Sequence, residues 1–129
     1  MVIDHLDAVW RAALAASGDQ AVAEDVTAAV LTEADRDALA DELVRGAVLA
    51  AVRRAPAPAF AAMAPAEREA VALARIAGCR ADEIAAALGI DNGGARRLLT
   101  EGLRSTMRRH RGSAPRTLPP ALGCGSAAS

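Results

Sequence analysis

EIAAALGIDNG, residues 83–93, carries the local pattern of a helix, a sharp turn and the start of a second helix. The apolar stripe expected to be buried by the first, short amphipathic helix comprises Ile84, Leu88 and Ile90. Gly89 permits the turn, and Asp91 is placed to cap the helix that follows. We therefore interpret residues 66–111 as a helix-turn-helix unit, which makes a DNA-binding module the leading hypothesis.

The composition is typical of a helical protein. Of its 129 residues, 53% are hydrophobic and only 2% aromatic, and alanine and leucine dominate the apolar set, which favours helices over strands. The longest apolar run, residues 46–52, is too short to cross a bilayer, and the chain begins with an acidic rather than a basic segment. Cys79 and Cys124 form no CxxC pair. We expect a reduced, cytoplasmic protein without membrane contact.

The predicted fold class is all-α, with a small N-terminal helical bundle joined by a Pro/Ala linker to a helix-turn-helix domain. Helical periodicity indicates helices over about residues 3–16, 20–32 and 35–54. The residues expected to be buried by the third helix are Leu39, Leu43, Val44, Val48 and Leu49. Pro56 and Pro58 cannot extend that helix, so the segment over residues 55–65 is predicted as the linker.

Beyond the linker, the first helix is predicted to start near Pro65 and to reach Ile76. The last helix is expected over residues 92–110. Its predicted buried residues are Ala95, Leu99, Gly102 or Leu103, and Met107. Residues 112–129 are rich in Gly, Ser, Ala and Pro and lack periodicity, so this tail is predicted to be disordered.

The formal net charge of −1 conceals a strong asymmetry along the chain. Residues 1–52 are acidic, whereas the region from Ala95 onward carries a series of arginines opposed by Glu101 alone. Arginine can pair bidentately with a phosphate or with a guanine edge, as DNA contact would require. The alternative is an ordinary solvated helix face. The asymmetry also suggests that the acidic bundle folds back on the basic helices and masks them.

The chain resembles the extracytoplasmic-function-type sigma factors of bacterial RNA polymerase over most of its length. Residues 66–73 (AEREAVAL), followed by Gly78 and residues 83–90 (EIAAALGI), look like region 4, which reads promoter DNA. Residues 12–19 (AALAASGD), followed by residues 23–26 (AEDV), are similar to the start of region 2, which grips the polymerase and melts DNA. The resemblance implies promoter-like double-stranded DNA, the RNA polymerase core and an anti-sigma-type regulator as partners.

Two departures from the family pattern qualify what the resemblance implies. Residues 27–54 contain no aromatic side chain, whereas the promoter-melting part of the family supplies aromatics that hold unstacked bases. We therefore do not expect this chain to open DNA strands alone. In the recognition helix, Leu98 and Glu101 stand where the family often carries arginine. These two residues favour the alternative, a sigma-derived protein-interaction module that binds polymerase or a regulator without reading DNA.

These considerations give two sets of candidate site residues. The predicted DNA-binding residues are Asn92, Arg96, Arg97, Arg104, Arg108 and Arg109. The predicted partner-binding residues are Glu24, Asp25, Leu98 and Glu101. The sequence contains no nucleophile–base pair, metal-ligand cluster or phosphate-binding loop, so we expect no enzymatic activity, no cofactor, no metal and no small-molecule substrate.

Overall fold

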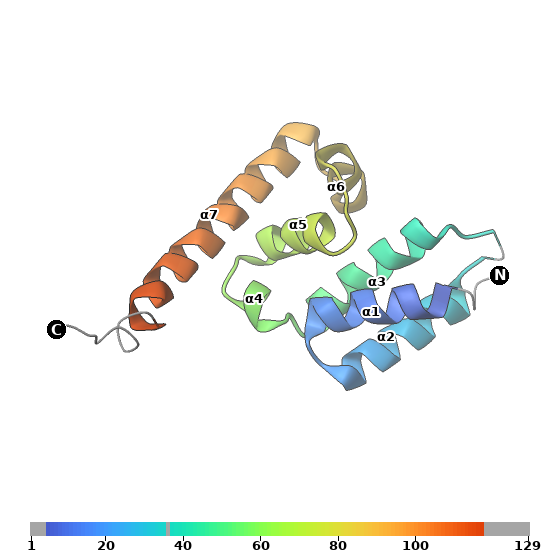
Figure 1. Ribbon diagram of the computed structural model, residues 1–129. Coiled ribbons are helices and arrows are strands. Elements are labelled where there is room, and N and C mark those ends of the chain that lie inside the picture. Colours follow the sequence, from blue (N-terminus) through green and yellow to red (C-terminus); the bar gives the residue numbers. More distant parts are fainter. Residues whose placement is uncertain (1–4, 36, 118–129) are drawn as a thin grey trace.

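The protein is all-α, as the composition predicts (Figure 1). The structure, a computed structural model, describes residues 5–35 and 37–117, with side chains as far as residue 108. The helices in this part of the chain are α1 (Leu6–Ser17), α2 (Gln20–Glu33), α3 (Ala40–Arg54), α4 (Pro58–Ala61), α5 (Pro65–Arg75), α6 (Ala81–Leu88) and α7 (Asn92–Thr117).

Helices α1, α2 and α3 form the predicted N-terminal bundle, in which α1 packs against both of the others. Its core contains several fully buried alanines, whose small side chains let the helix backbones approach closely: Ala13, Ala16, Ala23, Ala47 and Ala51. The turn between α1 and α2 follows from local signals. Gly18 adopts the left-handed conformation with φ 65°, and the Asp19 carboxylate accepts a hydrogen bond of 3.1 Å from the backbone N–H of Val22.

The start of α3 differs from the prediction. The helix begins at Ala40, five residues after the expected start at residue 35, and Leu39 is 65% exposed rather than buried. The Glu42 carboxylate accepts a hydrogen bond of 3.2 Å from the Leu39 backbone N–H, which caps the helix at this point. The preceding aspartates favour turns over helix. The first helix likewise begins at Leu6, and the expected start at Ile3 lies outside the described residues.

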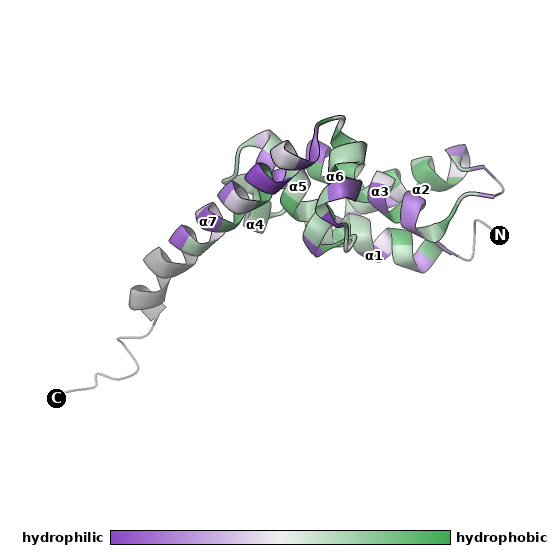
Figure 2. Ribbon diagram, turned by 90° about the horizontal axis from the view of Figure 1, so that it is seen from above, coloured by the Kyte–Doolittle hydropathy of each residue, from purple (hydrophilic) through white to green (hydrophobic). Residues whose placement is uncertain are grey.

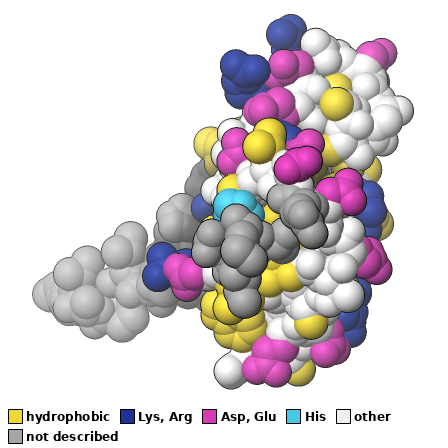
Figure 3. Space-filling view, turned by 90° about the vertical axis from the view of Figure 1, so that its right-hand side faces the viewer, with side chains coloured by type: hydrophobic (Ala, Val, Ile, Leu, Met, Phe, Trp, Pro, Cys, Tyr) yellow, Lys and Arg dark blue, Asp and Glu magenta, His cyan; other side chains and the backbone are white. Residues whose placement is uncertain are grey.

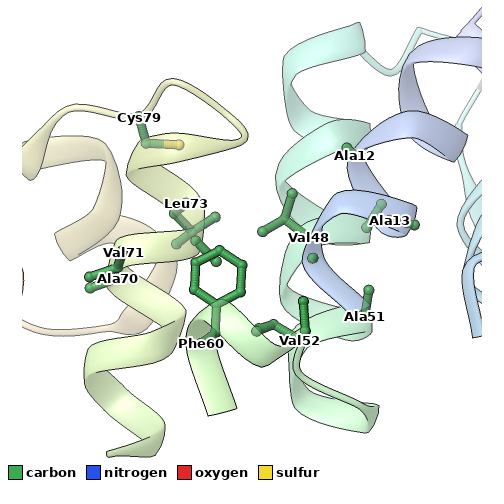
Figure 4. Close-up of a cluster of buried hydrophobic side chains, with 14 of the residues drawn as sticks. Ala12, Ala13, Val48, Ala51, Val52, Phe60, Ala70, Val71, Leu73 and Cys79 are labelled. Carbon is green, nitrogen blue, oxygen red and sulfur yellow. The ribbon is translucent and has the colours of Figure 1, made fainter. Parts of the chain in front are cut away.

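The segment predicted as a linker, residues 55–65, is folded onto both parts of the chain. It contains α4 and buries Ala57, Phe60 and Met63. The Ala57 backbone N–H donates to the carbonyl of Ala16 in α1 over 2.9 Å. In Figure 4 the Phe60 ring lies between Val52 of α3 and Leu73 of α5. The bundle and the helix-turn-helix unit therefore share one continuous hydrophobic core.

Ion pairs also join the bundle to the helix-turn-helix unit. In these pairs the bundle supplies the arginine and the other part supplies the carboxylate, which is the reverse of an acidic bundle folding back on basic helices. Arg53 of α3 donates through Nε and Nη2 to the two carboxylate oxygens of Glu69 in α5, over 3.0 and 3.1 Å. Arg45 of α3 lies 3.4 Å from Glu83 of α6. Among the described side chains, no arginine of α7 forms an ion pair with the bundle.

The last helix, α7, is longer and more exposed than predicted. It continues to Thr117, so residues 112–117 are helical rather than disordered, and the remainder of the predicted tail lies outside the described residues. Of the two alternatives Gly102 and Leu103, Gly102 is the buried residue and Leu103 is 47% exposed. The predicted burial of Met107 is wrong, because this side chain is 57% exposed.

The close contact between α5 and α7 explains that exposure. Gly102 is buried, and a side chain at this position would overlap Val71 of α5, so the two helices meet along the line through Ala95 and Gly102. Leu103 is turned about 100° away from that line. Hydrophilic residues recur along the exposed remainder of α7 (Figure 2). No helix in the described residues is long and apolar enough to span a bilayer.

Candidate nucleic-acid interface

The turn between α6 and α7 has the geometry that the sequence predicts. Gly89 adopts the left-handed conformation, with φ 71° and ψ 34°, and ends α6. The Asp91 carboxylate accepts a hydrogen bond of 2.6 Å from the backbone N–H of Gly94 and caps α7. A side chain at Gly94 would come within 3.0 Å of that carboxylate oxygen. The glycine therefore leaves room for the cap that sets the direction of α7.

Glu83 fixes the other end of α6. One carboxylate oxygen accepts a hydrogen bond of 2.8 Å from the Arg80 backbone N–H, and the other lies 3.4 Å from Arg45 of the bundle. Ile84 is fully buried, as predicted. The expected burial of Ile90 is wrong, because this side chain is 38% exposed. Ile90 follows Gly89 in the turn, outside the helix whose apolar stripe it would have continued.

The described arginines of α7 lie on the solvent side of the helix. Arg97, Arg104 and Arg108 recur at intervals of seven and four residues, which places them on one face. Arg96 lies beside this row. All four are exposed, and none forms an ion pair with a described carboxylate. The set Arg96, Arg97, Arg104 and Arg108 is called the arginine face below; the row from Arg97 to Arg108 spans about 16 Å along the helix.

Of the other two predicted DNA-binding residues, Asn92 and Arg109, the structure describes the side chain of Asn92. Asn92 is the first residue of α7 and is exposed. The Arg108 guanidinium donates to the Ser105 hydroxyl over 3.3 Å, a contact along the helix that leaves it free to reach outward. The side chain of Arg109 lies outside the described residues. The predicted residues whose side chains are described are therefore all exposed on one helix.

The predicted partner-binding residues of α7 line an apolar hollow beside the arginine face. Leu98 is half-buried and Glu101 is exposed, and they share the hollow with Ile90, Gly94 and Arg97. Sequence reasoning missed Ile90 and Gly94 as members of this hollow. It assigned Ile90 to the core because the apolar spacing at a helix end predicts burial. That spacing does not depend on whether another element covers the residue.

A second, polar hollow lies where the start of α5 meets α7. Glu67 of α5 lines it together with Glu101, Arg104, Ser105 and Arg108. Sequence reasoning missed Glu67 and Ser105, because their proximity depends on how α5 and α7 cross. The two carboxylates lower the positive potential at this end of the arginine face. No group of three or more His, Cys, Asp or Glu residues gathers as a metal site within the described part of the chain.

The remaining predicted partner-binding residues lie on a different part of the molecule. Glu24 and Asp25 are exposed on α2, in the N-terminal bundle and away from α7 (Figure 1). Asp25 lies 3.4 Å from Arg54 of α3, so it pairs within the bundle. The structure therefore does not bring the four predicted partner-binding residues into one site. Comparisons of the chain with protein-family models, curated proteins and solved structures found no match.

Proposed function

We propose that this protein is a sigma-factor-like transcription regulator that binds DNA through its helix-turn-helix unit and associates with RNA polymerase in the cytoplasm. The observation that carries the proposal is the arginine face on α7, directly after a capped helix-turn-helix turn. Its described guanidinium groups form no ion pair with the carboxylates that the structure describes, which supports their availability to phosphates.

The roles of the individual residues follow from their position along α7. The start of a recognition helix reaches base edges in the major groove, so Asn92, Arg96 and Arg97 are the proposed base or phosphate contacts. Arg104 and Arg108, further along, are the proposed contacts to the DNA backbone. Glu101 lies among them and repels phosphates, which favours a modest affinity. The arginines that neutralise phosphates make that affinity depend on salt.

The proposal is tested by removing the two arginines nearest the start of the face. Arg96→Ala combined with Arg97→Ala should weaken binding to random-sequence duplex DNA, because it removes two cationic groups that contact phosphates. Each lost phosphate contact should also reduce the magnitude of the slope of log K against log salt by about 0.9. Fluorescence anisotropy at about 50 to 200 mM salt measures both quantities. The matched control is Arg11→Ala combined with Arg75→Ala, which removes two exposed arginines outside α7. An unchanged slope in the α7 variant contradicts the proposal.

The apolar hollow favours a second candidate function, a sigma-derived module that binds polymerase or a regulator without reading DNA. Leu98 and Ile90 offer a partner an apolar contact beside Arg97 and Glu101. A nuclease-treated pull-down from the native host, analysed by mass spectrometry, distinguishes the candidates. The interaction module is supported if Leu98→Ala loses the large polymerase subunits while the double arginine variant keeps them. It also requires that the intact protein shows no affinity for DNA.

A further inference from the structure

The end of the bundle formed by the turn between α2 and α3 carries an exposed leucine among carboxylates. Leu39 is the most exposed of the large hydrophobic side chains in the described residues, at 65%. Around it in the sequence are Asp35, Asp37, Asp41 and Glu42, against the single Arg36, whose structure is not described. Apart from the bond by which Glu42 caps α3, no described side chain pairs with these carboxylates. We call Leu39 and its four acidic neighbours the acidic tip.

A complementary surface lies on α7. Leu103 and Met107 are four residues apart, on the same side of the helix, and both are exposed. Arg104 and Arg108 each follow one of them directly. This surface, called the basic stripe, combines two apolar side chains with two guanidinium groups that form no ion pair in the described part of the chain. Apolar contact at the centre with charge pairing at the rim is typical of protein interfaces.

The acidic tip cannot reach the basic stripe of its own chain in this structure. The turn between α2 and α3 and the far end of α7 lie at opposite ends of the molecule in Figures 1 and 2. Figure 3 looks at the end that carries the tip and shows acidic side chains spread across it. The two surfaces therefore face different neighbours, although their charge and apolar content match.

We propose that two copies of this protein associate head to tail, with the acidic tip of one copy docked on the basic stripe of the next. Leu39 packs between Leu103 and Met107, while the carboxylates of the tip face Arg104 and Arg108. Pairing of two α7 helices is disfavoured, because each presents four described arginines against two nearby carboxylates, Glu101 and Glu67 of α5. The surfaces are small, so the association is weak and depends on concentration.

Sedimentation equilibrium over a range of protein concentrations tests the association. At low salt the average mass of the full chain should rise toward at least twice the 13.1 kDa of one copy, and high salt should reverse the rise. Leu39→Ser should abolish the rise while preserving the fold, because serine is a favoured N-cap residue. Leu103→Gln combined with Met107→Gln should also abolish it. Leu6→Gln is the matched control, since Leu6 is 47% exposed on α1.

Mixing the two variants gives the sharpest outcome. Leu39→Ser keeps the basic stripe, and the double glutamine variant keeps the acidic tip. Each variant alone should stay at the mass of one copy. An equimolar mixture should form a complex of two chains and nothing larger, because that complex has no second pair of intact surfaces. The proposal is overturned if the intact protein remains at one copy at every concentration, if either variant associates like the intact protein, or if the mixture does not associate.

The arginines of the basic stripe also belong to the proposed DNA surface. DNA and the acidic tip should therefore compete for α7, a consequence that rests on the proposed function. The Leu103→Gln and Met107→Gln variant keeps all the arginines, so it should lose self-association and bind DNA with the affinity that the intact protein has at concentrations too low for association. Absence of DNA binding in a protein that still associates would reject the proposed function alone, and DNA binding without association would reject this inference alone.

Discussion

At the scale of single residues, Gly102 and Gly46 provide a matched pair of helical glycines. Replacing glycine with alanine in a helix normally adds up to about 1 kcal/mol of stability. Gly46 of α3 has nothing within 4 Å of the position of a new Cβ, so Gly46→Ala should be stabilising by that amount. Gly102→Ala should instead cost about 1–3 kcal/mol, because the new methyl overlaps Val71. Urea unfolding measures both; equal stabilisation by the two would contradict the close contact of α5 and α7.

The thiol of Cys79 gives a second prediction at this scale. Burial raises the pKa of the Cys79 thiol, and Glu83 and Asp41 add to the rise, while Arg45 opposes it. The folded protein should therefore be alkylated more slowly than the unfolded chain at any pH near 8.5. Because the folded pKa exceeds the unfolded one, the stability from this group is complete below about pH 8.5 and is lost as pH rises through the folded pKa. Iodoacetamide labelling and urea unfolding across this range, in a Cys124→Ser background, measure both effects.

At the scale of the elements, the cap of α7 is the feature on which the candidate interface depends. Asp91→Ala removes the acceptor for the Gly94 backbone N–H and should destabilise the protein by about 1 kcal/mol. Since the cap orders the start of α7, DNA affinity should fall as well. Glu24→Ala, an exposed carboxylate on α2, is the control and should change stability by less than about 0.5 kcal/mol. Equal effects of the two substitutions in urea unfolding would show that the cap contributes nothing.

At the scale of the whole molecule, the shared core predicts cooperative unfolding. Trp10, the only tryptophan, reports on the bundle, whereas far-ultraviolet circular dichroism reports on all helices. The two urea transitions should coincide, and Phe60→Ala should shift both together by about 3–5 kcal/mol, because its ring packs between the two parts. Separate transitions would mean that the bundle and the helix-turn-helix unit unfold independently. Leu6→Ala, at an exposed site, should leave both nearly unchanged.

Signals that act within a few residues were sufficient to predict much of the fold and the candidate interface. The turn at Gly89 and the cap at Asp91 were predicted from neighbouring residues, and the structure confirms both. The turn at Gly18 and the cap at Asp19 have the same local character. The spacing of the arginines along α7 likewise followed from helical periodicity. These predictions held because backbone conformation and capping depend on neighbours in the sequence.

Burial and proximity between elements were decided by the tertiary structure. An apolar residue is buried only if another element covers it, and α5 crosses α7 at Gly102, one residue before Leu103. Leu39 is exposed because no element covers it, whereas Phe60 of the proline-rich segment is buried in the core. The crossing of α5 and α7 also brings Glu67 beside Arg104. The sequence by itself determined where the helices turn and which residues share a helix face. Only the packing of helix against helix decided which of those faces water, DNA or a partner can reach.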